Sequence, residues 1–335
     1  MVHHAKKNGG GSMAQKRKKR GKKFIPKPME RPQALDQVPR ADAWEKTVST
    51  DDQAQTMQKG EEETRAKAAA LVDIQRKSVD VLTHTRTQVE NLPVDQMLDA
   101  INGGKYVMFD DLLGEDLCRE MMEEGQSMFD NNKLELDLNA GITSGEYGAA
   151  IKGGKEQYAD CPRSVEYVVS TTRHLAGILN KAGDGEDRYA SSRTLPYKLD
   201  ETVSLSGLKL FDRKARVSSL ALLTGNVNDD TASLEKKPFG CLVDKNSDVV
   251  DMRKVTAIYY MTPKGWDGVG CGGGVTFQDV DGIEKTIEAK NDRLLLFNSE
   301  ASVHRLEPWI GKDGIEGISG YIIAHLVRER TSKNT

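Results

Sequence analysis

Residues 293–309, RLLLFNSEASVHRLEPW, contain two short apolar segments, Arg293–Asn298 and Val303–Glu307, on either side of a polar stretch. Each segment has the length and composition of a β-strand. Six similar segments lie elsewhere beyond residue 205, separated by Gly, Asp and Asn: Lys209–Phe211, Ser218–Leu223, Val255–Met261, Gly274–Gln278, Lys285–Glu288 and Tyr321–Val327. Short strands at this spacing, with no helical pattern between them, predict a sandwich or barrel rather than a parallel α/β sheet.

Helical patterns precede these strands. A short strand at Tyr106–Phe109 leads into a predicted helix from Gly114 to about Met128, and a second helix is predicted over Val165–Leu179. His174 lies beside the apolar stripe of the second helix, and we expect a structural role for it because no ligand-type partner stands at helical spacing. The predicted fold class is therefore α+β, with helices packed outside a β-core.

Length and composition limit the function classes. The chain has 335 residues, of which 37% are hydrophobic, and this is enough for a buried core. No apolar run approaches about 18 residues, and the charged N-terminus has no apolar segment after it, so we expect neither a membrane span nor a secretory signal. The four cysteines show no Cys-x-x-Cys spacing, so we expect no disulfide framework or zinc module and an intracellular location.

Positive charge is concentrated near the N-terminus. Residues 1–40 hold twelve Lys or Arg and two acidic residues, a charge of +10, so the formal total of −3 leaves −13 on the other 295 residues. We predict a disordered basic tail over residues 1–45, since this segment has few large apolar side chains. The run Lys16–Lys23, KRKKRGKK, suits a nuclear-import receptor or contact with RNA or a ribonucleoprotein, and the alternative is a solvated tail. We therefore predict a nuclear or nucleolar location, with a cytoplasmic location as the alternative.

Residues 46–95 are predicted to be a helical connector. From Glu61 to Leu92 the chain is rich in Ala, Glu, Lys, Arg and Gln, all strong helix formers, and Pro93 ends the pattern. The rest of the chain, residues 96–330, is predicted to be one β-rich domain.

A glycine cluster at Gly268–Gly274 matches the G-x-G-x-x-G pattern of nucleotide-binding loops. A dinucleotide loop must follow a strand and open a helix, whereas these glycines lead into another strand, Val275–Phe277. A kinase assignment is also excluded, because the closest match to an HRD-type catalytic loop, His304-Arg305-Leu306, lacks the catalytic Asp. We predict a turn between strands in which glycine adopts positive φ.

Four stretches, taken in order, carry a family resemblance: Tyr106–Leu113 (YVMFDDLL), Arg253–Thr262 (RKVTAIYYMT), Trp266–Phe277 and Arg293–Trp309. Together they resemble the prolyl 4-hydroxylase-like branch of the iron(II)/2-oxoglutarate dioxygenases, which are oxidoreductases. The resemblance spans Tyr106 to Val327, and it implies a double-stranded β-helix (jelly roll) with supporting helices.

The resemblance also implies a site. In this superfamily two histidines and one carboxylate bind one face of Fe(II), leaving positions open for 2-oxoglutarate and dioxygen. His304 matches the distal metal histidine, and Asp244 matches the carboxylate of the His-x-Asp pair. Tyr260 matches a tyrosine that helps to hold 2-oxoglutarate.

Two positions depart from this pattern. Leu242 stands where the first metal histidine belongs, and Gly320 stands where the base that binds 2-oxoglutarate belongs. Cys241 should face the other side of its strand, so it does not replace the histidine. Lys285 and Arg293 remain as bases that could reach in from neighbouring strands. Without a cation, burial of the 2-oxoglutarate dianion carries a penalty of several kcal/mol.

Three readings follow. In the first, the chain is a pseudoenzyme that keeps the dioxygenase fold, needs no cofactor and binds a protein or ribonucleoprotein partner. In the second, an unusual Asp244/His304 iron site and 2-oxoglutarate support hydroxylation of a prolyl or similar protein side chain. In the third, Asp244 and His304 are ordinary polar residues of a β-sandwich.

Overall fold

The computed structural model describes residues 80–182, 193–224, 236–243, 251–315 and 317–330, all within one compact unit, Ile74–Thr335. The predicted tail at residues 1–45 and most of the predicted connector lie outside these residues. The helices are α2 (Val81–Glu90), α3 (Val94–Asn102), α4 (Glu115–Asp130), α5 (Lys155–Asp160), α6 (Pro162–Lys181), α7 (Arg213–Thr224) and α8 (Gly268–Cys271). The strands are β1 (Tyr106–Phe109), β2 (Glu135–Leu136), β3 (Glu146–Ile151), β4 (Leu199–Phe211), β5 (Arg253–Met261), β6 (Val275–Gln278), β7 (Glu284–Ile287), β8 (Arg293–Asn298), β9 (His304–Leu306) and β10 (Ser319–Arg328).

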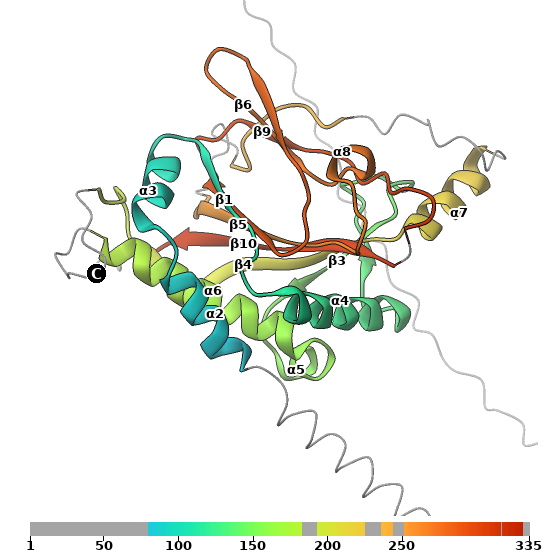
Figure 1. Cartoon of the computed structure of the whole chain (residues 1–335), viewed down its shortest axis with the longest axis horizontal. Coiled ribbons are helices and arrows are strands. Elements are labelled where there is room, and N and C mark those ends of the chain that lie inside the picture. The colour runs from blue at the N-terminus through green and yellow to red at the C-terminus, as the bar shows by residue number, and fades with distance from the viewer. Residues whose placement is uncertain (1–79, 183–192, 225–235, 244–250, 316, 331–335) are drawn as a thin grey trace, which may run out of the picture. The chain divides into compact units, whose positions relative to one another are not determined.

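The strands form two antiparallel sheets. The larger sheet has seven strands in the order β1-β8-β5-β10-β4-β3-β2, and the smaller has three in the order β7-β6-β9. A bridge between Gly240 and His304 adds one more segment beside β9. In Figure 1, α2, α4, α5 and α6 cover one face of the larger sheet, and β6 and β9 lie across its other face. This arrangement is a double-stranded β-helix with helices on one side, which confirms the predicted fold class.

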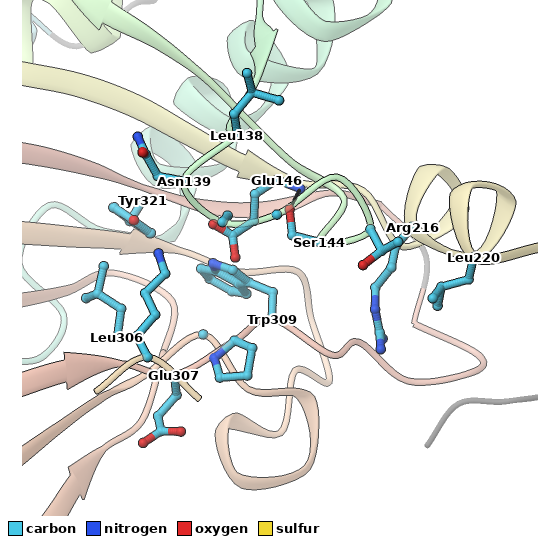
Figure 2. Close-up of a pocket in the computed structure, with 16 residues that line it drawn as sticks. Leu138, Asn139, Ser144, Glu146, Arg216, Leu220, Leu306, Glu307, Trp309 and Tyr321 are labelled. Atoms are coloured by element: carbon cyan, nitrogen blue, oxygen red, sulfur yellow. Dashed lines mark hydrogen bonds between the residues drawn. The ribbon is translucent and has the colours of Figure 1, made fainter. Parts of the chain in front are cut away.

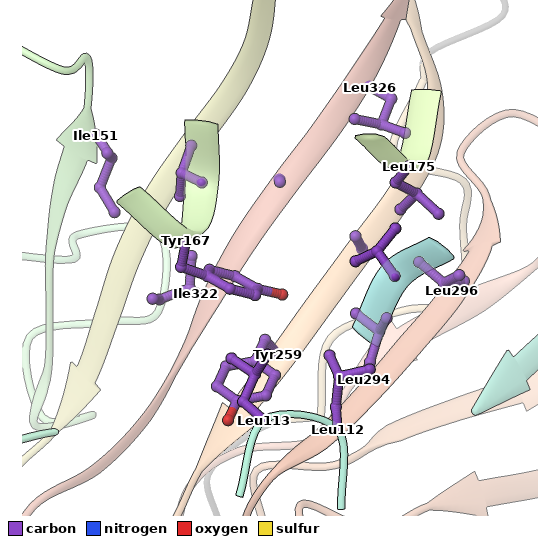
Figure 3. Packing of buried hydrophobic residues seen from close by; sticks show 14 of the residues in the cluster. Leu112, Leu113, Ile151, Tyr167, Leu175, Tyr259, Leu294, Leu296, Ile322 and Leu326 are labelled. Carbon is purple, nitrogen blue, oxygen red and sulfur yellow. The ribbon is translucent and has the colours of Figure 1, made fainter. Parts of the chain in front are cut away.

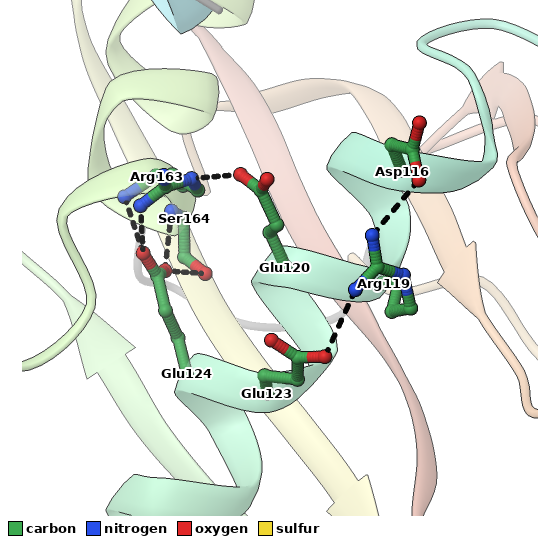
Figure 4. A network of polar contacts seen from close by, with 7 residues as sticks. All are labelled: Asp116, Arg119, Glu120, Glu123, Glu124, Arg163 and Ser164. Atoms are coloured by element: carbon green, nitrogen blue, oxygen red, sulfur yellow. Dashed lines mark hydrogen bonds and ion pairs between the residues drawn. The ribbon is translucent and has the colours of Figure 1, made fainter. Parts of the chain in front are cut away.

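The helical layer is held to the sheet by a large apolar core. Tyr167 of α6 and Tyr259 of β5 are both buried, and their ring centroids lie 4.9 Å apart (Figure 3). At the start of α6, the Glu124 carboxylate of α4 accepts hydrogen bonds from the backbone N–H groups of Arg163 and Ser164, at 2.9 and 3.0 Å (Figure 4). Glu124 thus satisfies donors that the first turn of a helix leaves without intrahelical partners.

Side chains along each strand of the larger sheet alternate between two apolar clusters. In β10, Ile322, Ala324 and Leu326 belong to the helix-side core, whereas Tyr321 and Ile323 contact a second cluster that includes Val275 and Phe277 of the smaller sheet. We call the second cluster the inner cluster, and the side of the larger sheet that contacts it the inner face. A metal site implied by the family resemblance would have to lie on this inner side.

One predicted strand is wrong. Ser218–Leu223 lies within the helix α7, which follows directly after β4. The Asp212 carboxylate accepts a hydrogen bond from the backbone N–H of Lys214 at 2.8 Å, an N-terminal capping contact that favours a helix here. A short apolar run does not by itself distinguish a buried strand from a helix. Among the described residues, no helix has both the length and the apolar character that crossing a membrane requires.

The glycine cluster forms a tight connection into β6, as predicted, after the four-residue helix α8. Gly272 and Gly273 have φ values of 77° and 82°. A Cβ atom at Gly272 would lie 2.1 Å from the Pro308 carbonyl oxygen, and one at Gly273 would lie 2.3 Å from the Trp309 ring. These glycines therefore let the chain pass close against Pro308 and Trp309.

Candidate functional site

His304 is the first residue of β9, and its side chain lies in the inner cluster. It is 4% exposed, and its ring centroid lies 4.7 Å from that of Phe297 and 5.9 Å from that of Phe277. Its Nδ1 lies 2.8 Å from the Ser302 carbonyl oxygen, which can only accept, so Nδ1 carries the hydrogen. Burial lowers the pKa of His304, which keeps the ring neutral and leaves the Nε2 lone pair available.

The structure brings Leu242, but no described carboxylate, to the same cluster. Leu242 is partly buried and packs against the inner cluster. Asp244 lies outside the described residues, so its assignment as a ligand stays a prediction. In the described parts of the chain, no group of three or more His, Cys, Asp or Glu side chains is placed to hold a metal ion. Of the described residues, His304 alone therefore fits the expected set of iron ligands.

Gly240 lies opposite His304, although no pattern in the sequence singles it out. It pairs with His304 across the bridge, with N–O distances of 3.0 and 2.9 Å, so the two residues direct their Cβ positions to the same side. A Cβ atom at Gly240 would meet no other atom within 4 Å. The chain thus leaves room opposite His304 at a position that carries no ligating side chain.

Gly320, where the resemblance expects the base that binds 2-oxoglutarate, lies on the other face of the sheet. Gly320 pairs with Met261 and Leu210, both of which belong to the helix-side core. A Cβ atom at Gly320 would lie 2.2 Å from the Lys209 carbonyl oxygen, so this backbone leaves no space for a longer side chain. The residue that stands beside Tyr260 on the inner face is Tyr321.

A row of four residues therefore crosses the inner face: Arg293, Tyr260, Tyr321 and Lys209, from β8, β5, β10 and β4. Both tyrosines are buried, and burial raises the pKa of each, so both are neutral. The cations at the two ends already have carboxylate partners. Arg293 Nε lies 2.6 Å from Asp110 Oδ1, and Lys209 Nζ lies 2.7 Å from Asp137 Oδ2.

The remaining basic candidates also point elsewhere. Lys285 is exposed, and its ammonium lies 5.7 Å from the Tyr106 ring centroid. Arg305 hydrogen-bonds to Glu307 at 2.8 Å and to Glu284 at 2.9 Å, on the side away from His304, as expected from strand alternation. Within the described residues, each cation near Tyr260 therefore has a partner of its own.

Beyond the tyrosine pair lies a cavity of about 430 Å³ (Figure 2). Its walls come from the loop between β2 and β3, from α7, and from the chain just after β9, and they include Glu146, Trp309 and Tyr321. Burial raises the pKa of Glu146 to about 7, an effect that nearby Asp137 strengthens and that Lys237 and Lys209 oppose. Glu146 belongs to no sequence motif. Its role at the cavity follows only from its position at the start of β3.

Comparison with solved structures finds proteins of similar fold. A prolyl hydroxylase from Trichoplax adhaerens, in complex with a peptide of the hypoxia inducible factor oxygen degradation domain, is 18% identical over 72% of this chain and 91% of its own, with a TM-score of 0.49. A prolyl-4-hydroxylase from Pseudomonas putida is 16% identical over 70% of this chain and 99% of its own, with a TM-score of 0.47. A prolyl 4-hydroxylase from Phytophthora capsici is 19% identical over 72% of this chain and 65% of its own, with a TM-score of 0.45.

No protein-family model matches the chain, and no curated protein matches it. The predicted resemblance to the prolyl 4-hydroxylase-like dioxygenases is confirmed for the fold, which follows from the strand order described above. Chemistry at the site has to be argued from the residues of this chain.

Proposed function

We propose that this protein is a catalytically degenerate relative of the iron(II)/2-oxoglutarate dioxygenases that acts as a binding module for a protein or ribonucleoprotein partner. The observation that carries the proposal is the position of Leu242. Its apolar side chain packs against the inner cluster, and the resemblance expects a second imidazole at this position of the sequence. An iron site made of one histidine and one carboxylate lacks a first-shell ligand, and even changes around such ligands cost about 10–100-fold in metal affinity.

The residues around Tyr260, where the resemblance expects 2-oxoglutarate to bind, support the same proposal. The inner-face neighbour of Tyr260 is a second neutral tyrosine, Tyr321, and the flanking cations Lys209 and Arg293 have carboxylate partners. A dicarboxylate bound there would have to displace one of these ion pairs or stay partly unpaired, which is costly in a buried site. The described residues therefore do not fit Fe(II) and 2-oxoglutarate together.

The second candidate is an active oxygenase that hydroxylates a prolyl or similar protein side chain. One observation favours it, namely that His304 presents Nε2 with its lone pair while Nδ1 is held by the Ser302 carbonyl. This is the arrangement of many metal-binding histidines. In that case Asp244 would supply the carboxylate.

Anaerobic titration with Fe(II) and 2-oxoglutarate distinguishes the two. We expect no saturable metal-to-ligand charge-transfer band from the folded protein. A saturable band that disappears in His304→Ala would overturn the proposal and establish a competent site. A band that persists in His304→Ala would also contradict the expectation, and it would place the metal away from His304.

A further inference from the structure

The cavity beyond the tyrosine pair contains two polar groups that face it without an internal partner. Glu146, at the start of β3, points into the space in front of Tyr321 (Figure 2). Within the described residues, neither the Glu146 carboxyl group nor the Tyr321 hydroxyl group makes a hydrogen bond or a close ion pair. Both groups line the cavity, so both are available to accept hydrogen bonds from a ligand that supplies donors.

One carboxyl group at the cavity is placed to receive a cationic ligand. The ammonium of Lys209 is paired with Asp137 at 2.7 Å, and the buried Arg216 donates to the Ile310 carbonyl oxygen at 2.8 Å. Glu307 is engaged by Arg305 at 2.8 Å. The carboxyl group of Glu146 is thus the acidic group at the cavity that no neighbour holds. Lys237 also lines the cavity, but it is exposed to water and forms no ion pair within the described part of the chain.

The cavity wall also suits an aliphatic stem behind the charge. Leu306 and Pro308 line it together with the ring of Tyr321, which stacks on Trp309 with an interplanar angle of 13°. Its volume of about 430 Å³ is within the usual range for pockets that bind small groups. Lysine and arginine side chains combine an apolar stem with a cationic end.

We propose that this cavity binds the lysine or arginine side chain of a protein partner, whose cationic group donates hydrogen bonds to the Glu146 carboxylate and the Tyr321 hydroxyl oxygen. This inference rests on the proposed role as a binding module and names the chemistry of the partner. Affinity should rise with pH through about 7, because the carboxylate is the form of Glu146 that binds a cation.

The test measures binding to the full chain by isothermal titration calorimetry, in buffer that contains a chelator so that no metal is bound. The probes are Nα-acetyl-lysine methylamide and Nα-acetyl-arginine methylamide. Nα-acetyl-norleucine methylamide, which has a similar stem and no charge, is the control ligand. We expect saturable binding of a cationic probe and none of norleucine. Glu146→Gln should weaken binding by about tenfold or more, as expected for loss of a charge-assisted hydrogen bond. The matched control Glu156→Gln changes an exposed carboxylate of α5 and should leave the affinity unchanged.

Lys237→Ala determines the sign of the ligand charge. For a cationic ligand this variant should bind more tightly, since a competing positive charge is removed. Weaker binding in Lys237→Ala, or binding of 2-oxoglutarate in place of the cationic probes, would overturn the inference and identify an anion site. Equal affinity of wild type and Glu146→Gln, or no binding of either cationic probe, would overturn it as well. Because metal is excluded, these outcomes do not depend on the iron titration that tests the proposed function.

Discussion

At the scale of single residues, the buried carboxyl group of Glu146 should affect the stability of the protein as well as ligand binding. Burial raises its pKa from 4.5 to about 7. Between these values the folded protein binds more protons than the unfolded chain, so this group lowers stability as pH rises through that window. Glu146→Gln removes the penalty, and we expect the variant to be more stable than wild type by about 1–3 kcal/mol at pH 8 and equally stable at pH 4.

Urea unfolding of both proteins at the two pH values measures this difference. Glu156→Gln, on the exposed side of α5, serves as the control and should follow wild type at both. A stability difference that is the same at pH 4 and pH 8 would mean that Glu146 titrates normally in the folded protein.

A second prediction about a single residue concerns Leu242 and the affinity for Fe(II). If it occupies the lost ligand position, Leu242→His should raise the affinity for Fe(II) by about tenfold or more, and the gain should vanish in the double variant with His304→Ala. Competition with a metal-sensitive dye under anaerobic conditions measures the affinity. Gly240→His is the matched comparison, since position 240 pairs directly with His304 and has open space. A gain in Gly240→His alone would place the ligand position two residues earlier.

The sequence could identify these residues only in part. His304 and Tyr260 stand in strands with clear apolar patterns, and the structure places both in the inner cluster. Gly320 shows the limit of this approach, because a register difference of one residue moves a side chain to the opposite face of a sheet. Glu146 and Gly240 belong to short β segments whose role depends on partners distant in sequence, so no local pattern could select them.

At the scale of elements, Asp292 links strand β8 to the start of helix α4. Its buried carboxylate accepts hydrogen bonds from the backbone N–H groups of Leu113 and Gly114, at 2.8 and 2.7 Å, and from the Tyr259 hydroxyl at 2.7 Å. Asp292→Asn replaces one acceptor oxygen with a donor that faces these donors. We expect a loss of about 2–4 kcal/mol in the free energy of unfolding, measured by urea denaturation.

Tyr259→Phe is the control for this prediction, because it removes one of the three hydrogen bonds and leaves the carboxylate in place. We expect it to cost about 1–2 kcal/mol, less than Asp292→Asn. If Asp292→Asn unfolds at the same urea concentration as wild type, then this carboxylate does not hold α4 on the sheet.

The elements that the sequence predicts well are those with a clear apolar pattern. Strand β8 was predicted with its observed bounds, and α6 was predicted to within a few residues at each end. The sequence predicts a strand in place of helix α7 because its apolar run is short and its capping residue, Asp212, directly follows a strand. The sequence pattern does not predict helix α3. Pro93 ends the preceding helical pattern, and the nine residues of α3 follow it directly.

At the scale of the whole molecule, charge separates residues 1–40, at +10, from the rest of the chain, at −13. We propose that the basic run Lys16–Lys23 serves nuclear or nucleolar import and contact with RNA. Deletion of residues 1–40 should then shift the fluorescently tagged protein from the nucleus toward the cytoplasm. Unchanged nuclear localisation would contradict the import role. The same deletion should leave the thermal unfolding of the domain unchanged, because residues 1–40 contain few of the large apolar side chains that a core requires.

Contact with RNA is tested separately, through the salt dependence of the affinity. If about six of the twelve tail cations neutralise phosphates, the affinity of the full chain for a single-stranded RNA should fall about 10²–10³-fold between 50 and 200 mM salt. Fluorescence anisotropy with labelled RNA measures this slope, and the deletion variant should show weak binding with little salt dependence. A variant with Lys16–Lys23 neutralised to glutamine tests the run itself and should lose most of the slope. If the slope survives deletion of residues 1–40, the RNA is bound by the domain, and the binding module would then recognise a nucleic acid as well as a protein.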